Sequence, residues 1–290
     1  MAFLQRFRRL PSSGIRALAS RQCSTGSASL VEIDREDAVC LIGINRPDVR
    51  NAVSVETARQ LQVAFCRFEE DPSLSVAILY GKGGTFCAGW DLKQLAGLDP
   101  EQTAETLQLG PMGPTAIQFS KPVIGALNGY AVAGGLELAI MCDLRIAEKS
   151  TVMGIFNRRF GVPLVDGCTV RLPKLIGLSR ALDLILTGRP VDADEALRIG
   201  LINRVVPDGK ALEEAKELAR QLASFPQACM RNDRNSTLRN TFICESFDEA
   251  IKYEHDQGLD VIRQESVPGA KRFADGSGRS GRFDDFNSKL

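Results

Sequence analysis

NGYAVAGGLELAIMCD, residues 128–143, decides the fold, because a short apolar segment runs through paired glycines into an apolar helix. The preceding PVIGAL, residues 122–127, is apolar throughout and fits a buried strand. Gly134 and Gly135 let the backbone approach a ligand closely, and a helix start presents free N–H groups with positive dipole character. Such a helix start can hold an oxyanion that develops on an acyl carbonyl.

Glu137 is the single acid in this otherwise apolar helix. Its neighbours Leu136 and Leu138 suggest burial, which an unpaired carboxylate resists, so we expect Glu137 to act beside the reacting carbons. The alternative is a first-turn acid that only complements the helix dipole, an effect under about 1 kcal/mol.

A second stretch has the same character. VAILY, residues 76–80, is typical of a strand, and GKGGTFCAGWDLKQL follows it at residues 81–95. Its glycines lead to Asp91 at the start of another helix, which would bring a second backbone N–H to the same carbonyl. Two such donors form an oxyanion hole.

Several motifs in one order resemble the crotonase (enoyl-CoA hydratase/isomerase) superfamily. The similarity extends over about residues 31–273 and implies an α/β fold, with a crotonase-like ββα spiral core and a C-terminal helical trimerisation region. The motifs that carry it are INRPDVRNAVS (44–54), TFCAGWDLKQL (85–95), KPVIGALNGYAVAGGLELAIMCDLRIA (121–147), FGVPLVDGCTVRLPKLIG (160–177) and LTGRPVDADEALRIGLINRVVP (186–207).

The resemblance implies an acyl-CoA thioester substrate and no tightly bound cofactor. Its oxyanion hole would be the backbone N–H groups of Trp90 and Gly134. The residues expected to contact coenzyme A are Ala52, Ala88, Asp91, Leu92 and Lys93. The cations that could meet its phosphates, if they do not simply face water, are Arg46, Arg50 and Lys82.

One departure from the resembled family concerns the second acid. Hydratase members carry a second glutamate in the next helix, and gap-free matching puts Asn157 in its place. An amide can hold water but has no acid–base equilibrium near neutral pH. Asp166, on the turn 163–167 from which other branches present an acid, is the nearest replacement. Capping the helix expected at 168–176, worth about 1 kcal/mol, is an equally good role for it.

Several activities remain open. Glu137 with Asp166 would add water to a 2-enoyl-CoA, and we favour this hydratase-type lyase reaction, in fatty-acid or branched-acyl catabolism. Glu137 alone would move a proton in double-bond isomerisation. Decarboxylation or thioester hydrolysis also fits enolate chemistry, and Asn157 leaves open a CoA-binding subunit without turnover.

The first 30 residues differ from the rest. They contain five arginines and no acid, so residues 31–290 hold five more acidic than basic residues. An Arg-rich, Ser-rich, acid-free leader predicts a mitochondrial transit peptide, cleaved between Arg21 and Leu30, and a matrix location. A disordered basic tail is the alternative. We expect a core at 31–200, a helical region at 201–275 and a flexible tail at 276–290.

Other site classes are not indicated. The eight cysteines form no C-x-x-C pair, so neither zinc nor a disulfide framework is expected. The single histidine, His255, lies in a charged helical stretch, and no G-x-S-x-G is present. The glycines do not follow G-x-G-x-x-G, and the acidic charge with 6% aromatic content argues against nucleic acid.

The remaining pattern predicts the order of elements. A hairpin is expected around Glu36 and Asp37, followed by an amphipathic helix at 54–70 with Ser54 as its N-cap. Strands at 76–80, 122–127 and 142–147 alternate with helices at 101–119 and 134–140, which favours parallel pairing. Beyond residue 178 the chain is helix-rich, with a short strand at 203–206 and a helix at 241–264. By analogy with the resembled family, these helices pack between subunits of a homotrimer or a dimer of trimers.

Overall fold

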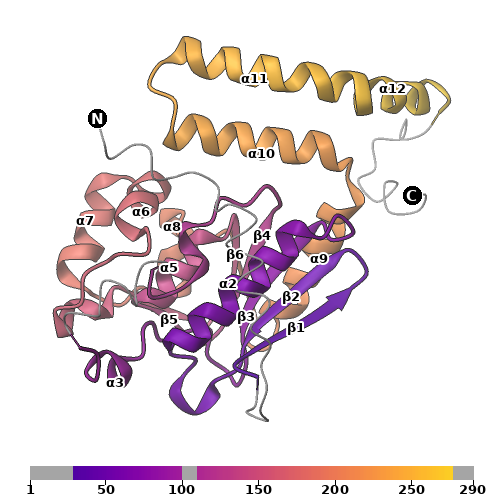
Figure 1. The fold of residues 1–290 in the computed structure, drawn as a ribbon. Helices are drawn as coiled ribbons and strands as arrows, with labels where there is room; N and C mark the ends of the chain where they lie inside the picture. Colours follow the sequence, from indigo (N-terminus) through magenta and orange to yellow (C-terminus); the bar gives the residue numbers. More distant parts are fainter. Residues whose placement is uncertain (1–28, 100–109, 277–290) are drawn as a thin grey trace.

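The computed structural model describes residues 29–99 and 110–276, which form a helix-covered sheet and a separate helical arm (Figure 1). The strands are β1 (Val31–Glu36), β2 (Val39–Ile44), β3 (Val76–Gly81), β4 (Val123–Leu127), β5 (Tyr130–Val132), β6 (Leu144–Glu148), β7 (Val152–Gly154) and β8 (Arg204–Val206). The α-helices are α2 (Val55–Glu70), α3 (Leu92–Leu95), α5 (Gly134–Met141), α6 (Cys168–Ile176), α7 (Leu178–Thr187), α8 (Ala193–Ile199), α9 (Ala211–Ser224), α10 (Gln227–Phe242), α11 (Phe247–Val261) and α12 (Val267–Ala274). Short helical turns are η1 (Pro47–Val49), η2 (Pro114–Ala116), η3 (Phe156–Phe160) and the π-helical η4 (Ile262–Ser266).

The main sheet confirms the predicted hairpin and the parallel pairing. Its order is β1-β2-β3-β4-β6-β8, with β1 antiparallel to β2 and every later pair parallel. A small second sheet, β5 with β7, was not predicted because its strands are only three residues long. Ser54 caps α2 as expected, since its Oγ accepts a hydrogen bond from the N–H of Thr57 at 3.2 Å.

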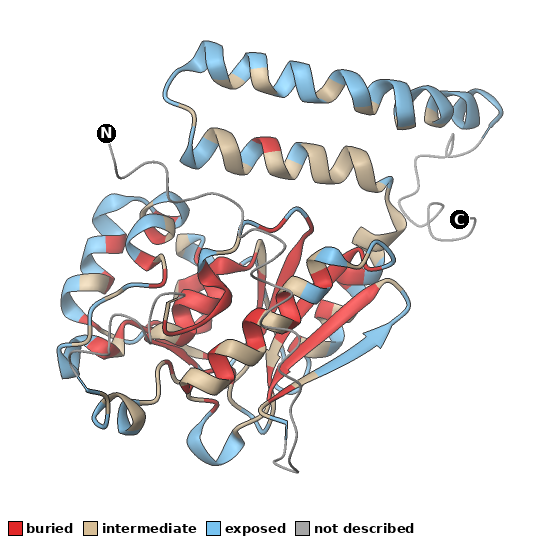
Figure 2. Ribbon diagram, in the orientation of Figure 1, coloured by how far each residue is buried: buried red, intermediate tan, exposed pale blue. Residues whose placement is uncertain are grey.

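Both faces of the sheet are covered, which explains why its central strands are apolar throughout. Alternate residues of β2 enter different cores: Ile42 packs in the cluster that includes Phe65 of α2, whereas Leu41 packs in the cluster that includes Ala215 of α9. Figure 2 shows the buried central strands against an arm in which α11 and α12 are mostly exposed and α10 is mostly of intermediate burial.

The structure corrects the predicted division at residue 200. β8 pairs with β6 in the main sheet, and α9 packs across β2, β3, β4 and β6, so the core continues to the end of α9. The part that stands apart is the helical arm, residues 227–274 (Figure 1). An ion pair of 2.9 Å between Arg234 and Asp143 anchors this arm next to the end of α5.

The helix predicted at 241–264 is confirmed from Phe247 onward by α11 and η4, but its predicted start is wrong. α10 ends at Phe242, and Ser246 starts α11 by accepting a hydrogen bond from the N–H of Glu249 at 3.2 Å. The polar sequence of α10 has no clear apolar stripe, which is why the pattern did not reveal it. Of the helix predicted at 101–119, residues 101–109 lie outside the described residues, and 110–119 contain only the short turn η2.

The predicted leader and tail also fall outside the described residues, apart from Ser29, Leu30 and Gly276. Across the parts of the chain that the structure describes, no helix is long and apolar enough to cross a membrane.

Candidate active site

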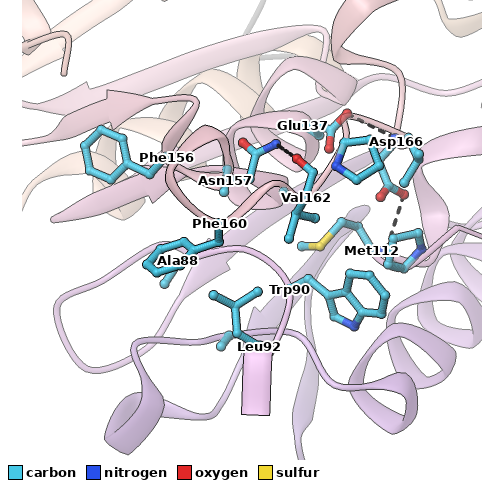
Figure 3. A pocket seen from close by; sticks show the side chains of 16 residues that line it. Ala88, Trp90, Leu92, Met112, Glu137, Phe156, Asn157, Phe160, Val162 and Asp166 are labelled. Carbon is cyan, nitrogen blue, oxygen red and sulfur yellow. Dashed lines mark hydrogen bonds between the residues drawn. The ribbon is translucent and has the colours of Figure 1, made fainter. Parts of the chain in front are cut away.

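A cavity of about 240 Å³ lies where three parallel strands end (Figure 3). Ala52 follows β2, Ala88 and Trp90 follow β3, and Gly134 follows β4 by way of β5. The carboxyl ends of parallel strands are the usual place for ligands in α/β sheets. The lining residues are Ala52, Ala88, Trp90, Leu92, Pro111, Met112, Ala133, Gly134, Glu137, Phe156, Asn157, Phe160, Val162, Pro163, Val165 and Asp166.

The two predicted oxyanion-hole segments lie against each other. Gly134 is the first residue of α5, and a side chain on Gly89 would place its Cβ 3.0 Å from the nitrogen of Gly134. Within the described residues, neither the N–H of Trp90 nor that of Gly134 donates a hydrogen bond, so both are free for a ligand. That the two N–H groups meet on one acyl oxygen stays a prediction.

Glu137 projects from the first turn of α5 into a buried setting and is only 3% exposed. Its Oε1 accepts hydrogen bonds from the N–H groups of Asp166 and Cys168, both at 3.0 Å. Burial raises the pKa of this carboxyl to about 7, and the neighbouring Asp166 carboxylate adds to the rise. A carboxyl with such a pKa can give or take a proton near neutral pH.

Asp166 is also buried, and the structure excludes its role as a helix N-cap. The N-cap of α6 is Gly167, and the carboxylate that accepts from the first N–H of the helix, that of Cys168, belongs to Glu137. Oδ1 of Asp166 instead accepts from the Thr115 hydroxyl at 2.5 Å and the Met112 N–H at 3.3 Å. Asp166 therefore shares the cavity with Glu137, which no local sequence signal could establish.

Asn157 lines the cavity, but its side-chain amide forms a hydrogen bond with the neighbouring turn. Nδ2 donates to the carbonyl of Val162 at 2.7 Å, and the N–H of Val162 returns a bond of 3.3 Å to the Asn157 carbonyl (Figure 3). Its Oδ1 is buried and has no hydrogen-bond partner among the described residues. This arrangement makes Asn157 a support for the turn that carries Asp166 rather than a proton carrier.

The residues predicted to contact coenzyme A separate into two groups. Ala52, Ala88 and Leu92 line the cavity. Asp91 instead caps α3 and forms an ion pair of 3.1 Å with Arg46, and Lys93 is not among the lining residues.

The other two cations expected near phosphates also have partners: Lys82 pairs with Glu32, and the Arg50 guanidinium lies 5.4 Å from the centre of the Tyr130 ring.

Sequence reasoning missed most of the apolar lining. Phe156 and Phe160 lie on either side of Asn157 in the sequence and line the cavity with it. Two aromatic residues around a suspected site residue were the sequence signal that could have predicted this part of the lining. Met112 offered none, because its contact depends on a segment without regular pattern. In the described ranges, no group of His, Cys, Asp and Glu side chains could hold a metal ion.

The sequence model of the enoyl-CoA hydratase/isomerase family matches residues 34–273. The chain therefore belongs to this family, the crotonase superfamily that the motifs resemble.

Two bacterial relatives match along most of their own length. Enoyl-CoA hydratase EchA19 of Mycobacterium tuberculosis is 36% identical over 260 residues, covering 87% of this chain and 95% of the relative. Crotonyl-CoA hydratase of Syntrophomonas wolfei is 33% identical over 244 residues, covering 83% of this chain and 93% of the relative.

Solved structures confirm the crotonase fold. The crystal structure of an enoyl-CoA hydratase from Mycobacterium tuberculosis superposes with a TM-score of 0.78 at 32% identity, covering 85% of this chain and 96% of the other. That of an enoyl-CoA hydratase from Bacillus anthracis gives 0.79 at 32% identity, with coverages of 85% and 96%.

The raised pKa of Glu137 predicts how the Glu137→Gln variant changes stability with pH. Between the ordinary pKa of 4.5 and about 7, the folded protein holds a proton that the unfolded chain has lost. The wild-type free energy of unfolding therefore falls as pH rises in this window, by up to about 1.4 kcal/mol per unit. Glutamine does not titrate, so the variant gains stability relative to wild type from pH 5 to pH 8 in urea denaturation. A difference between the two proteins that stays constant over this range would contradict the raised pKa.

Proposed function

We propose that this protein is an enoyl-CoA hydratase-type lyase that adds water to the double bond of a 2-enoyl-CoA thioester. The observation that carries the proposal is the pair of buried carboxylates, Glu137 and Asp166, on one cavity beside the free start of α5. Relatives named enoyl-CoA hydratase and crotonyl-CoA hydratase support the same reaction.

The arrangement accounts for each part of the addition. The thioester carbonyl would lie against the N–H groups of Trp90 and Gly134, which stabilise the enolate oxygen. Water adds its oxygen to the β-carbon as Asp166 accepts the proton it releases, and the α–β electron pair moves into the enolate. Glu137, protonated in part near pH 7, then gives a proton to the α-carbon as the enolate collapses. The thioester is not cleaved, so coenzyme A remains part of the product, and no separate cofactor takes part.

Double-bond isomerisation is the second candidate. Asn157 favours it, because an amide stands where hydratases of the resembled family place their second glutamate, and Glu137 alone would then move the proton. Product analysis with 2-enoyl-CoA and 3-enoyl-CoA substrates separates the two reactions, since only hydration removes the double bond.

The activity test combines turnover with binding. Loss of the conjugated-enoyl absorbance from a 2-enoyl-CoA is expected with wild type, and Glu137→Gln or Asp166→Asn should lower kcat by about 100-fold to 10,000-fold. Trp90 is the only tryptophan and lines the cavity, so its fluorescence reports thioester binding, which both variants should retain. Glu254→Gln, an exposed acid on α11, is the matched control. Undiminished turnover in either site variant would remove that residue from the mechanism, and binding without turnover by wild type would support a non-catalytic subunit.

We also propose that the protein is a homotrimer or a dimer of trimers, assembled through the helical arm. The arm exposes a series of apolar side chains, namely Phe242, Ile243, Phe247, Ile251, Leu259, Ile262, Val267 and Phe273. A monomer has little reason to leave so many apolar side chains on one projecting element.

Sedimentation equilibrium should give three or six times the chain mass of 31.6 kDa. Phe247→Asp, at a position 78% exposed, should lower the mass because a charge would be buried at the interface. Glu254→Ala on the same helix is the control. A monomeric wild type would refute the assembly.

The proposed location is the mitochondrial matrix, with residues 1–30 as a cleaved transit peptide. The relatives named above are bacterial, so this proposal rests on the leader composition alone. Residues 1–30 fused to a fluorescent protein should direct it to mitochondria, and replacing the five arginines with glutamine should abolish import. Diffuse fluorescence from the unaltered fusion would contradict the proposal.

A further inference from the structure

Three groups of the 110–116 segment surround one oxygen of Asp166. Oδ1 accepts the Thr115 hydroxyl at 2.5 Å and the Met112 N–H at 3.3 Å. Gly110, with a φ of +82°, approaches so closely that a Cβ there would lie 2.7 Å from the same Oδ1. Thr115 and Asp166 are each 3% exposed, so these bonds are shielded from water. Oδ2 accepts no hydrogen bond from the described residues and is the oxygen left for chemistry.

Arg171 of α6 ties this segment to the turn that carries Asp166. Its Nη2 donates to the carbonyl of Thr115 at 2.7 Å, and its Nη1 donates to the carbonyl of Asp166 at 3.3 Å. A Cβ on Gly167 would lie 2.1 Å from that Nη1, so glycine at 167 makes room for the guanidinium. Thr115, Asp166 and Arg171 thus close a ring of hydrogen bonds between two segments, 110–116 and 166–171.

The ring also distinguishes the two carboxylates electrostatically. Burial raises the pKa of Asp166 above its ordinary value, and the Thr115 hydroxyl, the Met112 N–H and the Arg171 charge oppose that rise. The Arg171 charge also lowers the pKa of Glu137, so the Thr115 hydroxyl is the contact that sets Asp166 apart. Asp166 and Glu137 lie close to each other, and the other charged or titratable groups near these two carboxyls are Arg171 and the Cys168 thiol. Among the described residues, Glu137 accepts hydrogen bonds from backbone N–H groups alone, whereas Asp166 also accepts one from the Thr115 hydroxyl.

We propose that Thr115 and Arg171 are positioning residues that hold Asp166 as the charged carboxylate of the site, with Oδ2 free to accept a proton. This inference rests on the proposed hydration, because it assigns proton acceptance from water to Asp166 and proton donation to Glu137. Neither Thr115 nor Arg171 lines the cavity, so Thr115 reaches the site through Asp166. The Arg171 charge lowers the pKa of both Asp166 and Glu137.

The decisive variant is Thr115→Val, which keeps the shape of the side chain and removes the hydroxyl. The hydroxyl stabilises the charged carboxylate, so the pKa of Asp166 should rise by about one to two units when the hydrogen bond is lost. Titration of carbon-13 labelled aspartate, assigned with Asp166→Asn, measures this rise without any turnover. In the hydration assay, the acid limb of the kcat profile should move up by the same amount while KM stays within about twofold.

Conservative variants separate positioning from folding. Thr115→Ser keeps the hydroxyl and should restore the wild-type pH profile, and Arg171→Lys should shift it less than Arg171→Gln. Thr169→Val, an exposed threonine on α6, should leave the profile unchanged. If Thr115→Val does not fold, comparing the Asp166 pKa and the pH profile of Arg171→Gln with those of Arg171→Lys tests the same positioning role.

The two proposals fail separately. An Asp166 titration unchanged in both Thr115→Val and Arg171→Gln overturns the positioning role, even with full hydratase turnover. If the variants raise the pKa of Asp166 but the wild-type protein hydrates no thioester, the positioning role stands and the hydratase proposal is overturned.

Discussion

A carboxylate in a protein interior has to be met by hydrogen-bond donors, and this requirement governs the arrangement of the site. Oε1 of Glu137 accepts the N–H groups of Asp166 and Cys168, so the first turn of α5 is bonded to the first turn of α6. The same two bonds fix the backbone from which Asp166 projects. A single buried oxygen therefore sets the distance between the two acids on which the proposed chemistry depends.

The sheet supplies the other constraint. Because both of its faces are covered by helices, strands β2, β3 and β4 are parallel and fully apolar, and the polar groups gather where these strands end. Gly89 and Gly134 permit the close contact of the two backbone segments there. Among the described residues, the N–H groups of Trp90 and Gly134 donate no hydrogen bond, and binding of a thioester carbonyl is the role proposed for them.

Asn157 stands where hydratases of the resembled family carry a second glutamate, and the contacts of its side chain suit an amide. The amide closes the turn at Val162, four residues before Asp166, and both Asn157 and Asp166 line the cavity. Glutamate at 157 would direct a negative charge at the Val162 carbonyl, which an amide N–H satisfies instead. The cavity that Asn157 lines thus holds two carboxylates, those of Glu137 and Asp166.

The sequence by itself determined the family, the hairpin, the parallel strand pattern, the cap at Ser54 and the burial of Glu137, because local periodicity and motif order carry that information. It left Asp166 balanced between capping and catalysis, placed one helix across the bend at 243–246, and gave no sign of Met112, Thr115 or Arg171. Only the tertiary structure showed that Gly167 caps α6, that the chain bends before α11 and which residues surround Asp166, whereas the catalytic role of Asp166 stays a proposal. The contacts of Asp166 join residues more than 50 positions apart, and which donor reaches a buried oxygen depends on how distant segments pack.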